Sequence, residues 1–157
     1  MKNALRLLAA ALLVVPLFAA DPARTIVWRA AELNQRGTEL AKHAGPDHSS
    51  RETLADFGHH RFRLLYRDAD GLPEQHDKIV DVVIVQSGES TLVVGGTMSG
   101  KRASGGAGEF VGTRLDGGER RQIAAGDIVH IPAGIPHAFL VEAGKHVAYV
   151  LVKFPAE

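Results

Sequence analysis

The clearest two-residue alternation of apolar and polar side chains in this chain lies at residues 61–67. Three apolar residues fall on one face and three arginines on the other, the apolar ones being Phe62, Leu64 and Tyr66. Alternation of this kind predicts a half-buried β-strand. His60 is in register with the apolar face and is therefore a candidate to line the interior of the fold.

A second strand is predicted where both faces are apolar. Residues 79–85 carry no polar side chain except Asp81, which is typical of a strand that lies between two layers. We expect Gly88 to end this strand, because glycine weakens strand interiors, and residues 91–94 to form the return strand. A carboxylate inside such a strand needs a partner, because burying an unpaired charge is costly.

One segment has a helical pattern instead. Residues 28–44 place apolar side chains at helical spacing, namely Trp28, Ala31, Leu33, Leu40 and Ala41. Gly37 lies in the middle and costs about 1 kcal/mol relative to alanine, so the helix is expected to be short or kinked. We expect it to pack against the outside of the sheet.

Residues 126–137 predict a strand, a sharp turn and a second strand. β-Branched residues at 128–131 favour the first strand, and Pro132 and Gly134 restrict the chain to a turn. His137 is then the first residue of the next strand. Because proline and glycine fix the backbone here, the direction of the His137 side chain is expected to matter.

The remaining sequence between these elements predicts one long loop and one last strand. Residues 95–112 are rich in glycine and predict the loop. A glycine-x4-glycine-lysine run inside it is not expected to bind phosphate, because Arg102 stands where a phosphate loop needs serine or threonine. Residues 147–154 predict a final apolar strand. Many short strands separated by turns indicate an all-β sandwich or barrel.

The spacing within residues 126–137 resembles a known motif. Gly126, five residues, Pro132, one residue, Gly134, two residues and His137 are similar to the second motif of the cupin superfamily. That motif usually ends in asparagine, whereas this chain has Val141. The resemblance covers roughly residues 58–154.

A partial first cupin motif lies upstream. The family pattern is His-x-His, three or four residues, Glu, six residues, Gly. This chain has Glu74 in place of the first histidine, keeps His76, has Asp81 in place of the glutamate and keeps Gly88. The resemblance implies an all-β fold, the cupin double-stranded β-helix or jelly-roll barrel, with a short N-terminal helix. More narrowly, residues 82–96 are similar to small exported bacterial cupins.

The start of the chain predicts export. Lys2 and Arg6 precede an unbroken apolar run over residues 7–20, which has the length of a signal peptide cleaved after Ala20. An uncleaved anchor is the alternative. We therefore expect a signal peptide at residues 1–20, a helical extension at 21–55, a cupin barrel at 56–157 and a periplasmic or secreted location.

Composition narrows the possible partners. The chain has 18 basic and 18 acidic residues, so no basic surface field predicts nucleic-acid binding. It has no cysteine, which excludes disulfides, thiolate metal sites and thiol catalysis. After signal cleavage no membrane contact is expected.

Four side chains are candidate metal ligands, as the resemblance implies: Glu74, His76, Asp81 and His137. Neutral imidazoles with one or two carboxylates suit Fe, Mn, Ni or Zn. Asp81 is shorter than the family's glutamate, so it is expected either to bind the metal or to orient His76 while Glu74 supplies the oxygen. The alternative is a polar pocket without metal, in which a histidine–aspartate hydrogen bond satisfies both groups. His130 is expected to be structural or exposed.

These residues predict a barrel that binds a divalent metal and a small organic ligand, in the manner of a metal-dependent oxygenase or isomerase. Loss of the proton from an imidazole accompanies metal binding, so metal affinity is expected to fall as pH drops through about 6.5. The alternatives are a small-molecule binding module without turnover, or a structural homodimer without metal.

Overall fold

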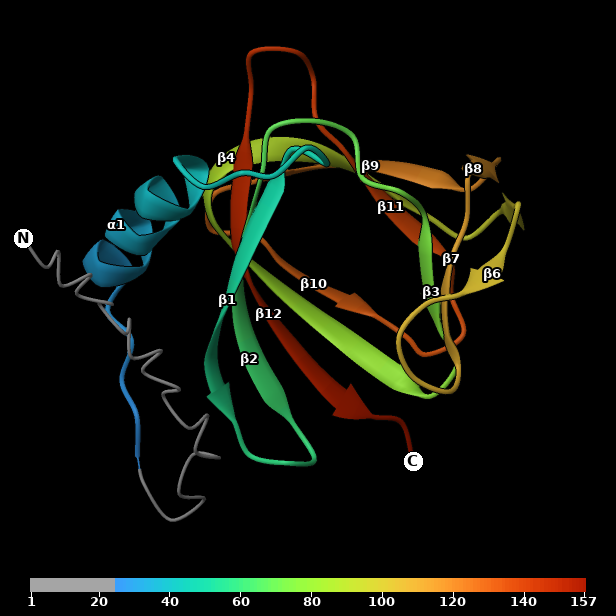
Figure 1. Cartoon of the computed structure of the whole chain (residues 1–157), viewed down its shortest axis with the longest axis horizontal. Helices are drawn as coiled ribbons and strands as arrows, with labels where there is room; N and C mark the ends of the chain where they lie inside the picture. The colour runs from blue at the N-terminus through green and yellow to red at the C-terminus, as the bar shows by residue number, and fades with distance from the viewer. Residues whose placement is uncertain (1–24) are drawn as a thin grey trace, which may run out of the picture.

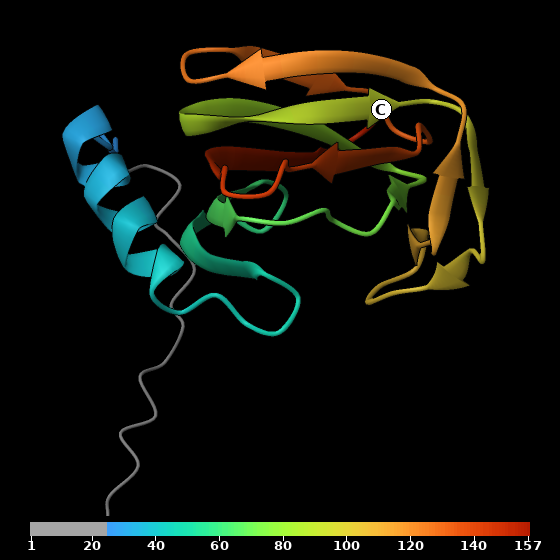
Figure 2. The same ribbon diagram turned by 90° about the horizontal axis from the view of Figure 1, so that it is seen from above.

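The computed structural model describes residues 25–157 as antiparallel strands that curl around a shared interior, with one helix outside them (Figures 1 and 2). The elements are α1 (Ala30–Ala41), β1 (Ser49–Asp56), β2 (Arg61–Arg67), β3 (Glu74–His76), β4 (Ile79–Val94), β5 (Thr97–Ser99), β6 (Arg102–Ala103), β7 (Glu109–Val111), β8 (Arg114–Asp116), β9 (Glu119–Ala124), β10 (Ile128–Ile131), β11 (His137–Leu140) and β12 (Val147–Pro155). The predicted all-β barrel with a short N-terminal helix is confirmed. The predicted signal peptide lies outside the described residues, and within them no helix is long and apolar enough to cross a membrane.

Strand β4 joins the two halves of the barrel. Its first half pairs with β12 and β10, and its second half pairs with β11 and β9. The prediction that Gly88 ends the strand was wrong: the chain bends there at φ 72° and continues as one element through Val94. A side chain at residue 88 would place its Cβ 2.0 Å from the carbonyl oxygen of His146, so only glycine fits at this bend.

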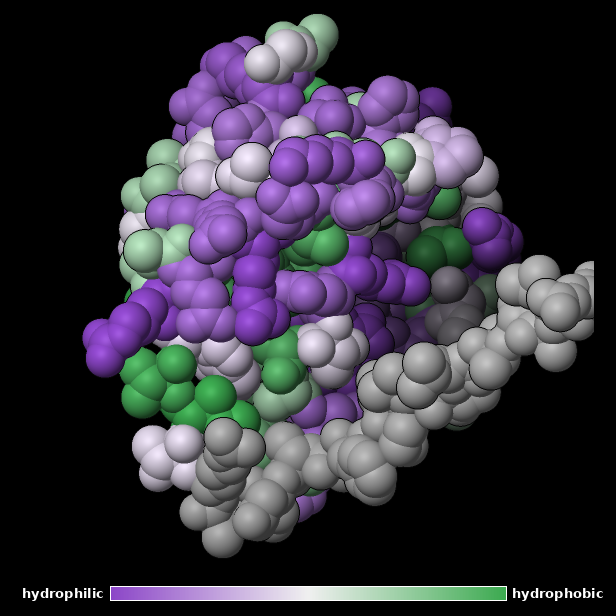
Figure 3. All heavy atoms as spheres, turned by 60° about the vertical axis from the view of Figure 1, so that its left-hand side comes forward, coloured by the Kyte–Doolittle hydropathy of each residue, from purple (hydrophilic) through white to green (hydrophobic). Residues whose placement is uncertain are grey.

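Helix α1 covers the outer face of the sheet, as predicted. Leu33 packs with Leu64 of β2 and Val150 of β12 in a buried cluster between the helix and the strands. Gly37 does not interrupt the helix, and it faces Ala148, whose Cβ would lie 3.4 Å from a Cβ at residue 37. Glycine therefore lets the helix lie close to β12. The side of the molecule that carries α1 presents mainly hydrophilic residues to solvent (Figure 3).

The structure shows which face of β2 points into the barrel, which the alternation of apolar and polar residues alone does not indicate. Phe62 and Leu64 pack beneath α1, outside the barrel. Arg61 and Arg63, on the opposite face, line a cavity inside the barrel, and His60 also lines that cavity. The apolar face of this strand is therefore covered by the helix, and its arginine face is turned to the interior.

The rest of the barrel interior is apolar and draws on both halves. Its buried cluster contains Val83, Leu92, Ile131, Phe139 and Tyr149, with the last two rings stacked at 4.8 Å between centroids. The glycine-rich segment 95–112 is not simply a loop: it contains β5, β6 and β7. Strand β7 pairs with β3 and thereby brings the end of this segment beside His76.

Candidate functional site

The candidate ligands lie on three neighbouring strands. Glu74 and His76 belong to β3, whose residue Glu74 is paired with His137 at the start of β11. A turn at residues 77–78 leads from β3 into β4 and returns Asp81 to the same interior. The backbone N–H of Gly134 donates a 2.7 Å hydrogen bond to the carbonyl of His76, so the turn that precedes His137 is fastened to β3.

The structure brings all four predicted residues together. One donor atom each from Glu74, His76 and His137 lies within 4.8 Å of the others. An oxygen of Asp81 lies 3.4 Å from Nε2 of His76 and 3.8 Å from Nε2 of His137. His76, Asp81 and His137 are buried, and Glu74 is half-buried.

Lys153 of β12 also reaches this cluster, and sequence reasoning missed it. Its Nζ lies 2.8 and 2.9 Å from the two carboxylate oxygens of Asp81 and 2.8 Å from Nε2 of His76. It is paired directly with Asp81 across the ladder between β12 and β4. Lys153 is the charged residue within an apolar run, in alternation with the interior residues Tyr149 and Leu151, and this alternation was the signal that could have found it.

Asp81 and Glu74 differ in their contacts: among the described residues Asp81 is hydrogen-bonded to Lys153, whereas Glu74 is not. The group of three that could hold an ion within the described residues contains Glu74 and not Asp81. The distance from Oε2 of Glu74 to Nε2 of His76 is 3.6 Å. An orienting role for Asp81, one of the two roles predicted for its shorter side chain, stays a prediction.

Glu109 is the second residue that the sequence did not reveal. Its Oε2 lies 2.7 Å from Nδ1 of His76, and the two residues are paired between β7 and β3. This bond keeps a proton on Nδ1 and directs Nε2 toward Glu74 and His137, which is the arrangement that metal-binding histidines use. His76 and Glu109 are 33 residues apart, and β4, β5 and β6 lie between them. No short motif in the sequence therefore indicates that the two side chains meet.

The protonation states follow from burial and from these contacts. Burial disfavours the charged form of His76, but hydrogen bonds to Asp81 and Glu74 outweigh it and raise the pKa of His76 to about 9. Burial alone dominates at His137 and lowers its pKa, so this imidazole is neutral at pH 7. Burial opposes ionisation of Glu74 and Asp81, yet their bonds to His76 lower the pKa of both carboxyls.

The contact between Lys153 and His76 places a condition on these protons. Two nitrogens 2.8 Å apart form a hydrogen bond only when one of them offers a lone pair. Both nitrogens lie among the carboxylates of Glu74, Asp81 and Glu109.

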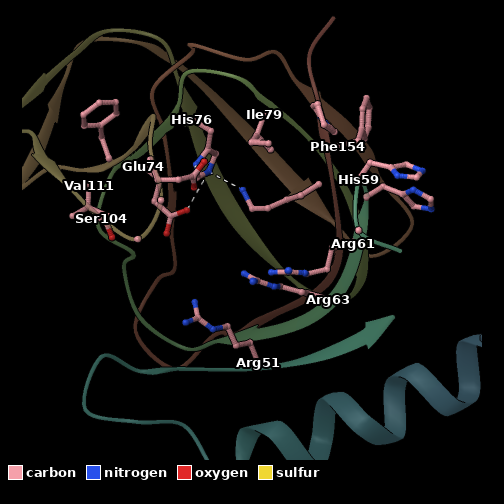
Figure 4. A pocket seen from close by; sticks show the side chains of 18 residues that line it. Arg51, His59, Arg61, Arg63, Glu74, His76, Ile79, Ser104, Val111 and Phe154 are labelled. Carbon is pink, nitrogen blue, oxygen red and sulfur yellow. Dashed lines mark hydrogen bonds and ion pairs between the residues drawn. The ribbon is translucent and has the colours of Figure 1, made fainter. Parts of the chain in front are cut away.

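The cluster opens to a cavity of about 490 Å³, which Glu74, His76 and Lys153 line together with arginines of β1 and β2 (Figure 4). A smaller cavity of about 100 Å³ lies against His137, Asp81 and Tyr149. Glu74 lines both cavities. A small molecule in the larger cavity can thus contact the cluster through Glu74 and His76.

Comparison with known proteins supports the fold. No protein-family model matches the chain, and no curated protein is significantly similar to it. The protein TT1209 from Thermus thermophilus matches with 18% identity and a TM-score of 0.54, over 75% of this chain and 92% of that protein. Rru_A2000 from Rhodospirillum rubrum, a cupin-2 domain, matches with 17% identity and a TM-score of 0.50, over 70% of this chain and 61% of that protein.

The curled antiparallel sheet with polar residues converging inside it defines a β-barrel with an internal polar cluster. Its fold is that of the cupin-2 domain of Rru_A2000, so the prediction of a cupin barrel fold is confirmed. At these identities the likeness establishes the fold, and the function depends on the chemistry of the site.

Proposed function

We propose that this chain is a metal-binding cupin that takes a small organic ligand in its barrel, with Glu74, His76 and His137 as the metal ligands. The observation that carries the proposal is the convergence of these three donor atoms within 4.8 Å, with Glu74 and His76 lining the large cavity and His137 the small one. Two imidazoles and one carboxylate suit Fe, Mn, Ni or Zn.

The residues around the donors fit a cation. Lys153 already places a positive charge against Asp81 and His76, so the carboxylates of the cluster can stabilise a bound cation. A metal on Nε2 of His76 must replace the proton of that nitrogen, and Nζ of Lys153, 2.8 Å away, must move aside to make room. The lysine stem is flexible, and its side chain lines the large cavity and is 18% exposed, so it has space to move aside.

The chain's own residues would prepare a ligand for reaction or binding. Glu109 holds the proton on Nδ1 of His76 and keeps Nε2 directed inward. Once displaced from His76, Lys153 can stay with Asp81 and remain a hydrogen-bond donor at the inner end of the cavity. A bound metal would act as a Lewis acid that polarises an oxygen of the ligand.

Metal analysis tests the proposal directly. The purified protein is treated with a chelator, offered Fe, Mn, Ni and Zn in turn and analysed by mass spectrometry for metal content. We expect one metal per chain, and we expect His137→Gln to abolish it. Glutamine is preferred to alanine because His137 is 3% exposed and packs edge-on against Phe139, so truncation would open a cavity.

His130→Gln is the matched control, because His130 is exposed on β10 and should leave the metal content unchanged. If the wild-type protein binds none of the four metals, the metal site is refuted.

A second function, a small-molecule binder without metal, is favoured by one observation. Lys153 satisfies Asp81 and the Nε2 of His76 with no further partner, as a metal-free polar pocket requires. In that case a ligand found by screening should bind equally well in the presence and absence of chelator. Binding that requires the metal would exclude this alternative.

A further inference from the structure

Three arginines line the large cavity from two adjacent strands. Arg51 comes from β1, and Arg61 and Arg63 come from β2. Figure 4 shows their side chains reaching into the cavity from the wall across from Glu74 and His76. The cavity therefore has a basic wall and an acidic wall, and a ligand inside it contacts both.

Most charges in this cavity are already compensated. Arg61 is paired with Asp56, which its Nε contacts at 2.6 Å. Lys153 is paired with Asp81. On the acidic wall, Glu109 is bound to His76, and Glu74 also lies within 3.6 Å of that imidazole.

Arg51 and Arg63 differ from these groups. Among residues 25–157, neither guanidinium has an ion-pair or hydrogen-bond partner. Burial, followed by the charges of Arg61 and Arg51, lowers the pKa of Arg63. A partly buried guanidinium that is crowded by like charges is stabilised by any anion that binds beside it.

We propose that the cavity selects small organic molecules that carry an oxyanion, a carboxylate or a phosphoryl group, held by Arg51 and Arg63. Both oxyanions match the planar fork of a guanidinium. The rest of the molecule extends to Glu74 and His76, and about 490 Å³ is a volume typical of small-molecule sites. The inference rests on the proposed function only for the existence of an organic ligand, and not for the metal.

Isothermal titration calorimetry of chelator-treated protein at low ionic strength tests the inference. The probes are succinate, glycerol 3-phosphate and succinamide, the neutral counterpart of succinate. We expect succinate or glycerol 3-phosphate to bind, succinamide not to bind, and added salt to weaken binding. The anion that binds more tightly identifies the oxyanion.

Two substitutions assign the binding to the basic wall. Arg63→Gln and Arg51→Gln should each weaken oxyanion binding by about ten- to a hundredfold, as expected for a charge-assisted hydrogen bond. Arg120→Gln is the control, because Arg120 is exposed on β9 and does not line the cavity. If Arg63→Gln lowers the melting temperature, Arg51→Gln decides the result, because Arg51 is exposed and its loss should not affect folding.

Three results would overturn the inference: no binding of either anion up to the millimolar range, equal binding of succinamide, or unchanged affinity in both variants. Metal binding is measured separately in the absence of oxyanions. A protein that binds metal but no oxyanion refutes this inference alone, whereas one that binds an oxyanion but no metal refutes only the metal site.

Discussion

Lys153→Met removes the cation that competes with a metal for His76. The ammonium contacts Nε2 of His76 at 2.8 Å and the carboxylate of Asp81 at 2.8 and 2.9 Å. A hydrogen bond to a charged group contributes about 1.5–3 kcal/mol. Removing this competitor should therefore raise metal affinity by about ten- to a hundredfold.

The same substitution should destabilise the metal-free protein. It leaves Asp81, which is 3% exposed, without its countercharge, and breaking a buried pair costs about 3–5 kcal/mol. We expect the lower part of this range, because Lys153 retains some solvent contact. Added metal should restore the melting temperature, since a ligand that binds only the folded state stabilises it.

The assay is competition with a chromophoric chelator, combined with thermal melts with and without metal. Lys145→Met is the control, because Lys145 pairs with Glu89 and Glu142 in an exposed loop. The reasoning fails if folded Lys153→Met protein binds metal no more tightly than the wild type. That result would mean that the ammonium does not occupy the metal's position.

Three further predictions concern the same protein. Because the pKa of His76 is raised to about 9, its proton competes with metal throughout the neutral range. Metal affinity should therefore rise about tenfold per pH unit up to pH 9 and fall toward acid. A plateau above pH 7 in metal titrations at a series of pH values would contradict this. Glu109→Gln should lower metal affinity by about 10–100-fold, whereas Glu119→Gln, on exposed β9, should leave it unchanged in the same chelator competition. The mature chain should begin at Asp21 in the exported fraction, and mass spectrometry that finds intact Met1 in the cytosol would refute cleavage.

The expected pH window changes once the structure is known. An ordinary imidazole predicts a loss of metal near pH 6.5, but His76 lies between carboxylates that hold its proton to higher pH. Of the two histidines in the cluster, His137, whose pKa burial lowers, is the neutral one at pH 7. The pH dependence therefore reports on His76 and not on the histidine that the second motif identifies.

The parts of the site that were predictable are those fixed by local chain geometry. Pro132 and Gly134 restrict the turn before His137, and Glu74 and His76 share a strand face by their spacing. The meeting of these two segments was implied by the resemblance to the two cupin motifs. Alternation places Lys153 on the same strand face as Tyr149 and Leu151, but its partner Asp81 is known only once β12 is paired with β4. Its role was therefore hidden.

The direction of the arginines was hidden for a different reason. Alternation at residues 61–67 shows that β2 has two faces, but not which face meets the helix. Because α1 covers Phe62 and Leu64, the polar face is turned inward. An amphipathic strand beside an amphipathic helix thus leaves two arrangements open, and only the assembled layers distinguish them.

The continuity of β4 through both halves of the barrel has a consequence for cooperativity. Its first half carries Asp81 against β12, and its second half pairs with β11, which begins at His137. Because one strand carries both ladders, we expect their opening to be coupled through the bend at Gly88. Any ligand that bridges His76 and His137 would therefore slow hydrogen exchange across the whole barrel and not only beside the site.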